Sequence, residues 1–342
     1  MRTRRTLLAG GLSAVAAPAF AAPGPDYRSA LAQAYGGPVD PAAAHLAAQT
    51  AAAAAQARRD ELLRGQGLAG GSPGERLRRL WEDPRWLYPD SEAGRSRAVS
   101  DMNTRLAAFR PNLARALGDL PIAPAQVRRA PAAKAAARRG GSRQLPERGK
   151  PGVYYLDLSD IRTRPSWSLP SLAFHEVTPG HLLQMPLQAA ACPPQARLKA
   201  SGAYSEAWAI YAEQLCADLG AYAGDPLGEV GYLQWRLFRL GRIVADTGLH
   251  AMGWSRDRAV AAMTALQGRS VAFTSIEADI ARIAAAPGKY AAEGLGALAF
   301  NAWRPADRRR WPAFHKAVLA DGPWPYGELE KRVREKLLLT GA

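Results

Sequence analysis

The sequence predicts a mainly α-helical protein, and three features indicate this class. Pairs of a capping side chain followed by proline recur along the chain and are typical of helix starts. Alanine-rich runs such as residues 51–55 favour helix, because alanine has the highest helix propensity. Two stretches, residues 127–131 and 152–158, have the composition of short strands. The capping pairs are Asp40-Pro41, Ser72-Pro73 and Asp225-Pro226.

The first 21 residues are typical of an export signal. Three arginines precede a short apolar stretch that ends in the small-x-small sequence Ala19-Phe20-Ala21. The adjacent pair Arg4-Arg5 favours the twin-arginine route, and an ordinary secretory signal is the alternative. Gly10, Gly11 and Pro18 interrupt the apolar run, which is also short, so we expect no transmembrane helix in the mature chain.

The first long helix should run from Pro41 to about Arg64. The four glycines between residues 65 and 71 should then form a linker. Ser72 and Glu75 have the spacing of a capping box, so further helix should follow. We expect helix up to about residue 118, with a break at Pro111 because proline lacks the amide proton that a helix needs.

Residues 122–151 change character and carry many basic side chains against a single acid, Glu147. A solvated loop is the plain interpretation, and a lid that meets an acidic substrate is the alternative. Residues 152–158 then predict a strand that includes Tyr154. It is either an edge strand that pairs with an extended substrate or a plain core strand. The basic residues are Lys134, Arg138, Arg139, Arg143, Arg148 and Lys150.

Residues 171–184 carry the strongest chemical signal in the chain. His175 and Glu176 are adjacent, and His181 follows six residues after the first histidine. Two imidazoles and a neighbouring carboxylate are what a hydrolytic zinc site needs. At about 100° per residue, a straight helix would turn the two histidines far apart. Pro179 and Gly180 should break the helix and allow His181 to fold back toward His175.

A third zinc ligand should come from the acidic segment that follows. Glu206 and Glu213 are seven residues apart and therefore share one face of a helix. The face between them is largely apolar, so a carboxylate there needs a partner, and a metal ion can be one.

These two segments resemble the family known as domain of unknown function 885, whose bacterial members are proposed zinc metallopeptidases. The family motif H-E-x-x-P-G-H-x-x-Q matches residues 175–184, and E-G-W-x-x-Y-x-E matches residues 206–213 with Ala207 in place of glycine. A D-x-G-x-H element matches residues 246–250. The resemblance runs from about Leu80 to the C-terminus. It implies a mainly α, zincin-like metallopeptidase architecture with a short β element beside the metal helix.

The resemblance also implies roles for single residues. One zinc ion would be bound by His175, His181 and Glu206, with Glu176 as the general base. Other residues are expected to orient the ligands or to contact the substrate. These are Gln184, Tyr204, Glu213, Arg242, Asp246 and Tyr154.

A predicted helix from Asp225 to about Met252 carries a polar stripe. Arg239, Arg242, Asp246 and His250 follow one another at helical steps on an otherwise apolar helix. The stripe faces either solvent or the site, and the resemblance favours the site. There, Asp246 and His250 could orient each other, or His250 could act in catalysis by stabilising the oxyanion.

The chain departs from the resembled family in one element. After Pro287 and Gly288, Lys289 stands where the family has glutamine, and Glu293 stands where it has tyrosine. That tyrosine is a candidate transition-state donor in the family, so this departure puts efficiency or substrate range in question. Tyr290 could substitute from a shifted position. We expect a structural role for His315.

The net charge of +15 falls to +12 once Arg2, Arg4 and Arg5 are removed with the signal. It could attract anionic polymers or membrane surfaces, but GC-rich coding also explains the arginine bias. No nucleic-acid-binding signature accompanies the charge, so we expect no nucleic-acid partner. Cys192 and Cys216 flank the site, and either a disulfide or two buried thiols is consistent with this.

The sequence therefore predicts a periplasmic or secreted bacterial zinc hydrolase that cleaves a peptide or amide bond. Residues 22–71 should form an alanine-rich helical segment, and residues 72–342 the metallopeptidase-like domain. One alternative is a binding protein of the cell envelope that has lost turnover. Another is an envelope protein that binds polyanions.

Overall fold

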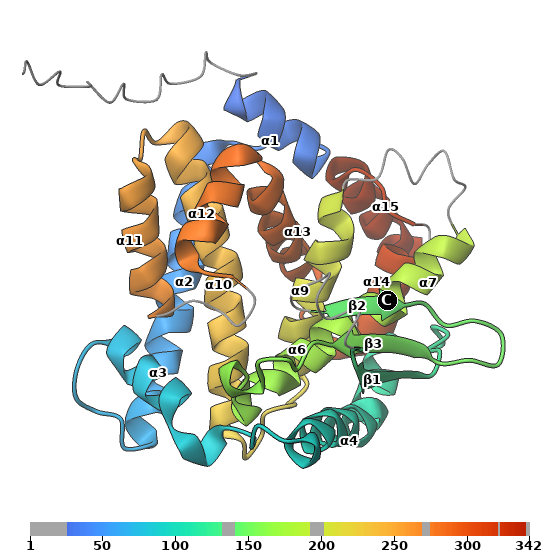
Figure 1. The fold of residues 1–342 in the computed structure, drawn as a ribbon. Helices are drawn as coiled ribbons and strands as arrows, with labels where there is room; N and C mark the ends of the chain where they lie inside the picture. The colour runs from blue at the N-terminus through green and yellow to red at the C-terminus, as the bar shows by residue number, and fades with distance from the viewer. Residues whose placement is uncertain (1–25, 132–140, 192–201, 269–273, 321, 340–342) are drawn as a thin grey trace, which may run out of the picture.

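The protein is mainly helical with one small β-sheet, as the sequence predicts (Figure 1). The computed structural model describes residues 26–131, 141–191, 202–268, 274–320 and 322–339. The predicted export signal, the centre of the basic segment and Cys192 lie outside these residues. Cys216 is fully buried.

A long buried helix, α10 (Pro226–Ala251), lies at the centre of the helical part (Figure 1). It packs most extensively against α2 (Pro41–Gly65) and also against α11 (Arg256–Gln267) and α13 (Lys289–Trp303). Most of its side chains are buried, as expected for a helix that is apolar on most faces. The buried guanidinium of Arg59 on α2 donates to Gln234 of α10 at 2.7 Å, so this polar contact is satisfied inside the core.

The remaining helices surround this core. They are α1 (Tyr27–Tyr35), α3 (Pro73–Glu82), α4 (Glu92–Leu117), α6 (Leu169–Glu176), α7 (His181–Ala191), α9 (Gly202–Asp218), α12 (Ile276–Ala285), α14 (Trp311–Leu319) and α15 (Tyr326–Leu339). Ser72 and Glu75 form the predicted capping box of α3. Among the described residues, no helix is both long enough and apolar enough to cross a bilayer.

The predicted break at Pro111 is wrong, because α4 continues through this residue to Leu117. Phe109 and Leu113 on either side of it are buried in the main core. Proline costs a helix about 3 kcal/mol in isolation, but burial of two large apolar side chains contributes a similar amount. Tertiary packing therefore keeps the helix continuous here.

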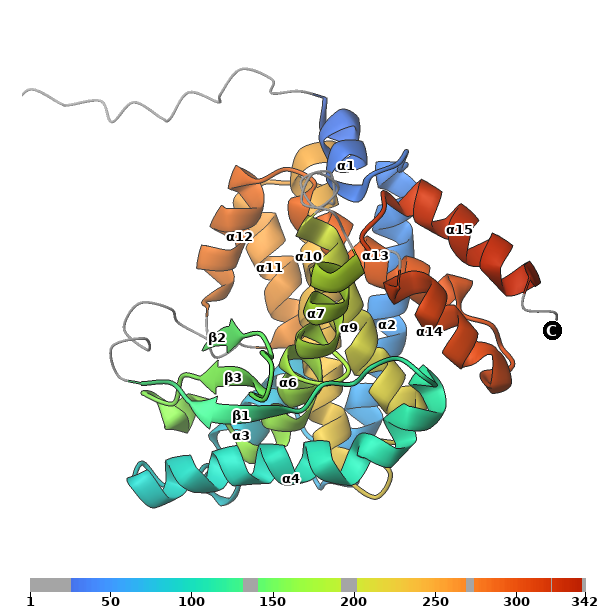
Figure 2. The same cartoon turned by 90° about the vertical axis from the view of Figure 1, so that its right-hand side faces the viewer.

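The sheet contains three strands in the order β1 (Ala125–Arg129), β3 (Gly152–Leu156), β2 (Gly141–Gln144). β1 pairs with β3 in parallel, and β2 pairs with β3 in antiparallel fashion. β3 is thus the central strand, as in the core-strand alternative, and the edge-strand alternative does not hold. β2 is the edge strand that lines the cavity of the site. Helix α4 runs beneath β1 in both views (Figures 1 and 2), and its Asn103 bonds the backbone of Val127.

Candidate metal centre

A sharp turn between α6 and α7 brings the two histidines together. His175 lies in the last turn of α6 and His181 begins α7, and their ring centroids are 4.9 Å apart. Gly180 makes this turn possible, since a Cβ atom there would lie 1.8 Å from the carbonyl oxygen of His175. Its amide donates to the carbonyl of Phe174 at 3.0 Å. The predicted helix break at Pro179-Gly180 is therefore present, and the peptide bond before Pro179 is cis.

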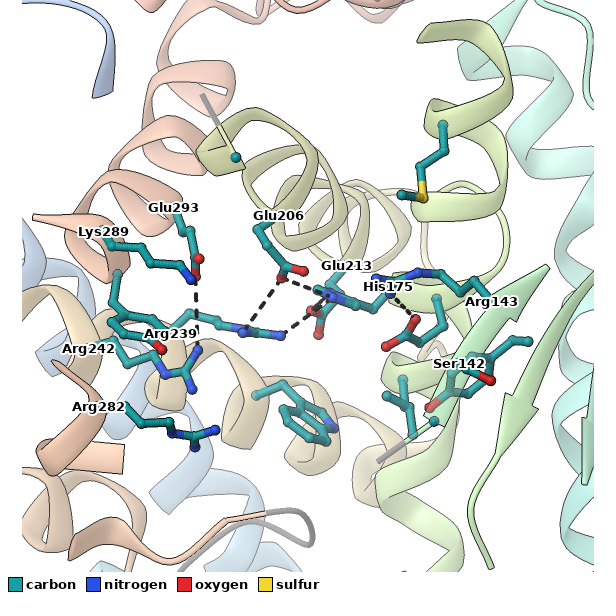
Figure 3. Close-up of a pocket in the computed structure, with 18 of the residues that line it drawn as sticks. Ser142, Arg143, His175, Glu206, Glu213, Arg239, Arg242, Arg282, Lys289 and Glu293 are labelled. Carbon is teal, nitrogen blue, oxygen red and sulfur yellow. Dashed lines mark hydrogen bonds and ion pairs between the residues drawn. The ribbon is translucent and has the colours of Figure 1, made fainter. Parts of the chain in front are cut away.

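Glu206 reaches the two histidines from the neighbouring helix α9. Its Oε1 lies 3.3 Å from Nε2 of His181, and its Oε2 lies 3.5 Å from Nε2 of His175. One ligand atom from each of the three residues falls within 4.8 Å of the other two. Both histidines are buried, while Glu206 is partly exposed to the cavity. Figure 3 shows Glu206 pointing toward His175 in this cavity.

The outer ring nitrogen of each histidine is held by a hydrogen-bond acceptor. Nδ1 of His175 donates to Glu213 Oε1 at 2.8 Å, and the other oxygen of Glu213 accepts from Ser171. Nδ1 of His181 donates to the hydroxyl of Ser205 at 3.1 Å, which itself donates to Gln184 Oε1 at 2.7 Å. These chains place the proton of each neutral ring on Nδ1. They leave both Nε2 lone pairs directed at the centre, as metal ligation needs.

The residues present fit a zinc ion. Nε2 of His181 is buried and has no hydrogen-bond partner among the described residues. Such orphaned atoms are uncommon and call for a partner. Two imidazole nitrogens and one carboxylate oxygen form a donor set typical of catalytic zinc. Glu213 contacts His175 directly, and Gln184 contacts His181 through Ser205.

Burial and mutual contacts shift the pKa values of His175, His181 and Glu206 in different directions. Burial alone would lower the pKa of His175, but the contacts of its ring with the Glu206 and Glu213 carboxylates outweigh burial and raise the pKa to about 9. For His181, burial dominates and lowers the pKa. Burial opposes ionisation of Glu206, but its close contacts with both histidines hold its pKa well below the usual value. The carboxylate and the two imidazoles therefore influence one another's ionisation at this centre.

Glu176, the predicted general base, is paired with an arginine from the sheet. Arg143 of the edge strand β2 donates to the Glu176 carboxylate, and both side chains line the same cavity. Figure 3 shows Arg143 beside His175 in this cavity. Tyr154 of β3 also lines this cavity and is buried. Arg143 belongs to the basic segment that was predicted to be either a loop or a lid. The part of this segment that follows residue 140 forms the strand β2 beside the cavity. No pattern in the sequence indicated that Arg143 pairs with Glu176.

The cavity beside the cluster has a volume of about 660 Å³ and is lined by helices on one side and by the sheet on the other. Arg239 projects from α10 toward the cluster, with Nη2 3.5 Å from His175 Nε2 and Nη1 3.9 Å from Glu206. Arg242 lies one turn further along the same helix and also lines the cavity. Of the polar stripe predicted for this helix, Arg239 and Arg242 therefore line the cavity.

The other two residues of the stripe lie outside the cavity. Asp246 is buried and accepts from the backbone amides of Gly288 and Ala291, both at 2.9 Å, so it caps the start of α13. His250 stacks on the ring of Tyr27 at 5.3 Å. Asp246 and His250 are 4.0 Å apart, beyond hydrogen-bonding distance. Their predicted place at the site is therefore wrong, because they lie four and eight residues beyond Arg242 on the helix, past the end of the cavity.

Tyr204 is also absent from the cavity lining, since its hydroxyl donates to the carbonyl of Val318 at 2.8 Å. Lys289 and Glu293, by contrast, both line it, as does Tyr290. Burial and the charge of Glu206 raise the pKa of Glu293 to about 7. The positions at which the chain departs from the resembled family therefore shape the cavity itself.

Comparison with known proteins identifies the family and supports the fold. The family model "Bacterial protein of unknown function (DUF885)" matches residues 5–333. A solved structure of a proposed lipoprotein from Colwellia psychrerythraea is 32% identical, with a TM-score of 0.82 over 92% of this chain. A proposed lipoprotein of unknown function from Shewanella oneidensis is 18% identical, with a TM-score of 0.70 over 91%, and shares the fold.

This chain spans only 55% and 59% of those two proteins. No protein of curated function matches it significantly. Since the family model covers nearly the whole sequence, the chain belongs to the DUF885 family of bacterial proteins.

Proposed function

We propose that this protein is an exported zinc-dependent hydrolase of peptide or amide bonds with a zincin-like catalytic arrangement. The observation that carries the proposal is the convergence of His175, His181 and Glu206 beside Glu176. These three residues would hold one zinc ion. When bound, zinc polarises a carbonyl and acidifies a water molecule. The relatives described as lipoproteins support a place in the cell envelope, periplasmic or secreted.

The chain's own residues supply the remaining steps. Glu176 would accept a proton from the attacking water and pass it to the leaving amine, in keeping with its exposure to the cavity. Arg143 fixes the direction of that carboxylate through their hydrogen bond. Arg239 points a guanidinium at the centre, and its Nε has no hydrogen-bond partner among the described residues. We therefore assign stabilisation of the developing negative charge to Arg239 rather than to His250.

Two substitutions separate the ligand from the base. Glu176→Gln should keep zinc but lower peptide hydrolysis about a hundred- to ten-thousand-fold, since an amide cannot accept the proton. Glu206→Ala should instead lose zinc affinity, and activity with it. Zinc content by elemental analysis and turnover of a peptide library are the measurements. Loss of zinc in Glu176→Gln, or parental zinc affinity in Glu206→Ala, contradicts these roles.

The departures at Lys289 and Glu293 favour one alternative, a zinc-bearing binding protein that has lost turnover. The same measurements discriminate the two. Stoichiometric zinc without cleavage of any library peptide by the parent protein would support the binding protein. Turnover that depends on Glu176 would support the hydrolase.

A further inference from the structure

One end of the cavity is basic and lies away from the histidines. Arg242 of α10, Arg282 of α12 and Lys289 of α13 line it together (Figure 3). Three separate helices thus direct cationic side chains into one region. The proposed hydrolytic step uses none of these three side chains.

The cations at this end exceed the neighbouring acids. Asp279 accepts from Arg242 at 2.8 and 2.6 Å and from Arg282 at 2.8 Å, so one carboxylate is shared by two guanidinium groups. The amino group of Lys289 lies 5.4 Å from the centre of the Tyr290 ring, and it forms no ion pair within 4 Å among the described residues. Glu293 is the other acid nearby, so three cationic side chains face two carboxylates at this end.

Arg242 keeps one side of its guanidinium available. Its Nε and Nη2 bond to Asp279, while Nη1 lies 4.0 Å from Glu293, beyond hydrogen-bonding distance. The group is buried, and its guanidinium lies over the rings of Phe238 and Tyr290 at 4.2 and 4.7 Å. Its position is therefore fixed before any ligand arrives, which lowers the entropic cost of binding an anion.

We propose that Arg242, Arg282 and Lys289 form a subsite for a carboxylate of the substrate. This inference rests on the proposed function, because it concerns the substrate of the same cavity. A carboxylate suits the subsite, since guanidinium and ammonium groups form strong charge-assisted hydrogen bonds with it. The substrates would be peptides that place this anion beside the bond to be cleaved.

The distance between Arg239 and Arg242 along α10 indicates how far the bound carboxylate lies from the bond that is cleaved. Arg239 contacts the metal ligands, and Arg242 follows three residues later, which is about 4.5 Å along the helix axis. One residue of an extended peptide spans about 3.5 Å. The carboxylate therefore lies within one or two residues of the cleaved bond. A terminal carboxylate there makes the protein a carboxypeptidase that removes one or two residues, and an acidic side chain is the other source of the same chemistry.

Three N-acetylated tripeptides test the subsite. Acetyl-Ala-Phe-Ala carries a free carboxylate, its C-terminal amide carries none, and acetyl-Ala-Phe-Glu amide carries one on a side chain only. Binding is measured by calorimetry on the zinc-loaded Glu176→Gln protein, so that no turnover interferes. We expect the acid to bind about ten- to a hundred-fold more tightly than the amide, as the loss of charged hydrogen bonds implies. Tight binding of the glutamate peptide instead would locate the recognised carboxylate on a side chain.

Substitutions assign the preference to these residues. Lys289→Met and Arg282→Gln, each in the Glu176→Gln protein, should reduce the acid-to-amide ratio by several-fold or more. Lys331→Met is the matched control, because Lys331 is exposed on α15 and does not line the cavity. The subsite proposal is wrong if none of the three peptides binds, if all three bind equally, or if both substitutions leave the ratio unchanged.

Hydrolysis by the parent protein separates this proposal from the proposed function. Equal cleavage of the acid and the two amides would support the proposed hydrolase function and contradict the carboxylate subsite. If no peptide is cleaved but the acid binds preferentially in a way that depends on Lys289, the subsite is supported and the hydrolase function is contradicted.

Discussion

At the scale of single residues, the hydrogen-bond partners of the two histidine Nδ1 atoms orient the rings of the candidate centre. Glu213 receives the Nδ1 proton of His175, and Ser205 receives that of His181. Glu213 is buried and also bonds Ser171, so its carboxylate is held in place. The orientation of both Nε2 atoms therefore depends on residues that do not themselves contact a metal.

Glu213→Gln should weaken zinc binding about ten- to a hundred-fold, the usual effect of altering such an outer partner. The amide oxygen can still accept from His175, but it lacks the charge that increases the basicity of the ring. Zinc affinity is measured by competition with a chelator, and circular dichroism checks that the variant folds. Glu335→Gln, an exposed substitution on α15, is the control and should bind zinc like the parent. Unchanged affinity in Glu213→Gln would show that the contact to His175 does not tune the site.

At the scale of elements, the turn between α6 and α7 decides whether the histidines meet. Gly180→Ala should disrupt it, because the added methyl group would overlap the carbonyl oxygens of His175 and Phe174, at 1.8 and 2.5 Å. We expect zinc content to fall sharply and the melting temperature to drop, although every ligand remains. Gly327→Ala is the matched control, since a Cβ there meets no atom within 4 Å and alanine favours the helix it occupies. A Gly180→Ala protein that binds zinc normally would refute this account of the turn.

The sequence was most informative where a feature is local. The capping pairs marked the starts of α2, α3 and α10, and Pro179-Gly180 marked the helix break, because each acts through adjacent backbone groups. The convergence of His175, His181 and Glu206 was predictable for a related reason. Helical periodicity relates Glu206 to Glu213, and the family motifs supply the pairing of Glu206 with the histidines.

Features that depend on distant packing were missed. Pro111 was expected to break α4, but burial of its neighbours keeps the helix continuous. His250 shares a stripe with Arg239, but helical periodicity gives direction and not distance along the axis, so the cavity ends before His250. Asp246 bonds the start of α13, a contact 42 residues away that no local pattern encodes.

At the scale of the whole molecule, the cavity lies between helices α10, α12 and α13 on one side and the sheet on the other. Contacts between helices that are distant in the sequence fix the relative positions of the elements around this cavity. His315 of α14 provides one, since its Nδ1 donates to Ala116 of α4 at 2.8 Å and its Nε2 accepts from Tyr211 of α9 at 2.7 Å. It is fully buried, as its predicted structural role requires.

This junction should make stability depend on pH. Burial lowers the pKa of His315 to about 4 from its usual 6.5. Between these values the unfolded chain binds a proton that the folded protein does not, so the free energy of unfolding falls as the pH falls. The stability lost between pH 6.5 and pH 4 in this way is roughly 3 kcal/mol, and the loss is complete near pH 4.

Urea unfolding at several pH values, compared with His315→Gln, measures this contribution. Glutamine does not titrate, but its side chain can still donate to Ala116 and accept from Tyr211. The variant should be less stable than the parent at pH 7, and the gap should narrow toward pH 4 as the parent loses the histidine's contribution. Carboxylates titrate in both proteins and cancel in the difference. A gap that stays constant between pH 7 and pH 4 would mean that His315 is protonated equally in the folded and unfolded states, and that its bonds to α4 and α9 do not depend on the neutral ring.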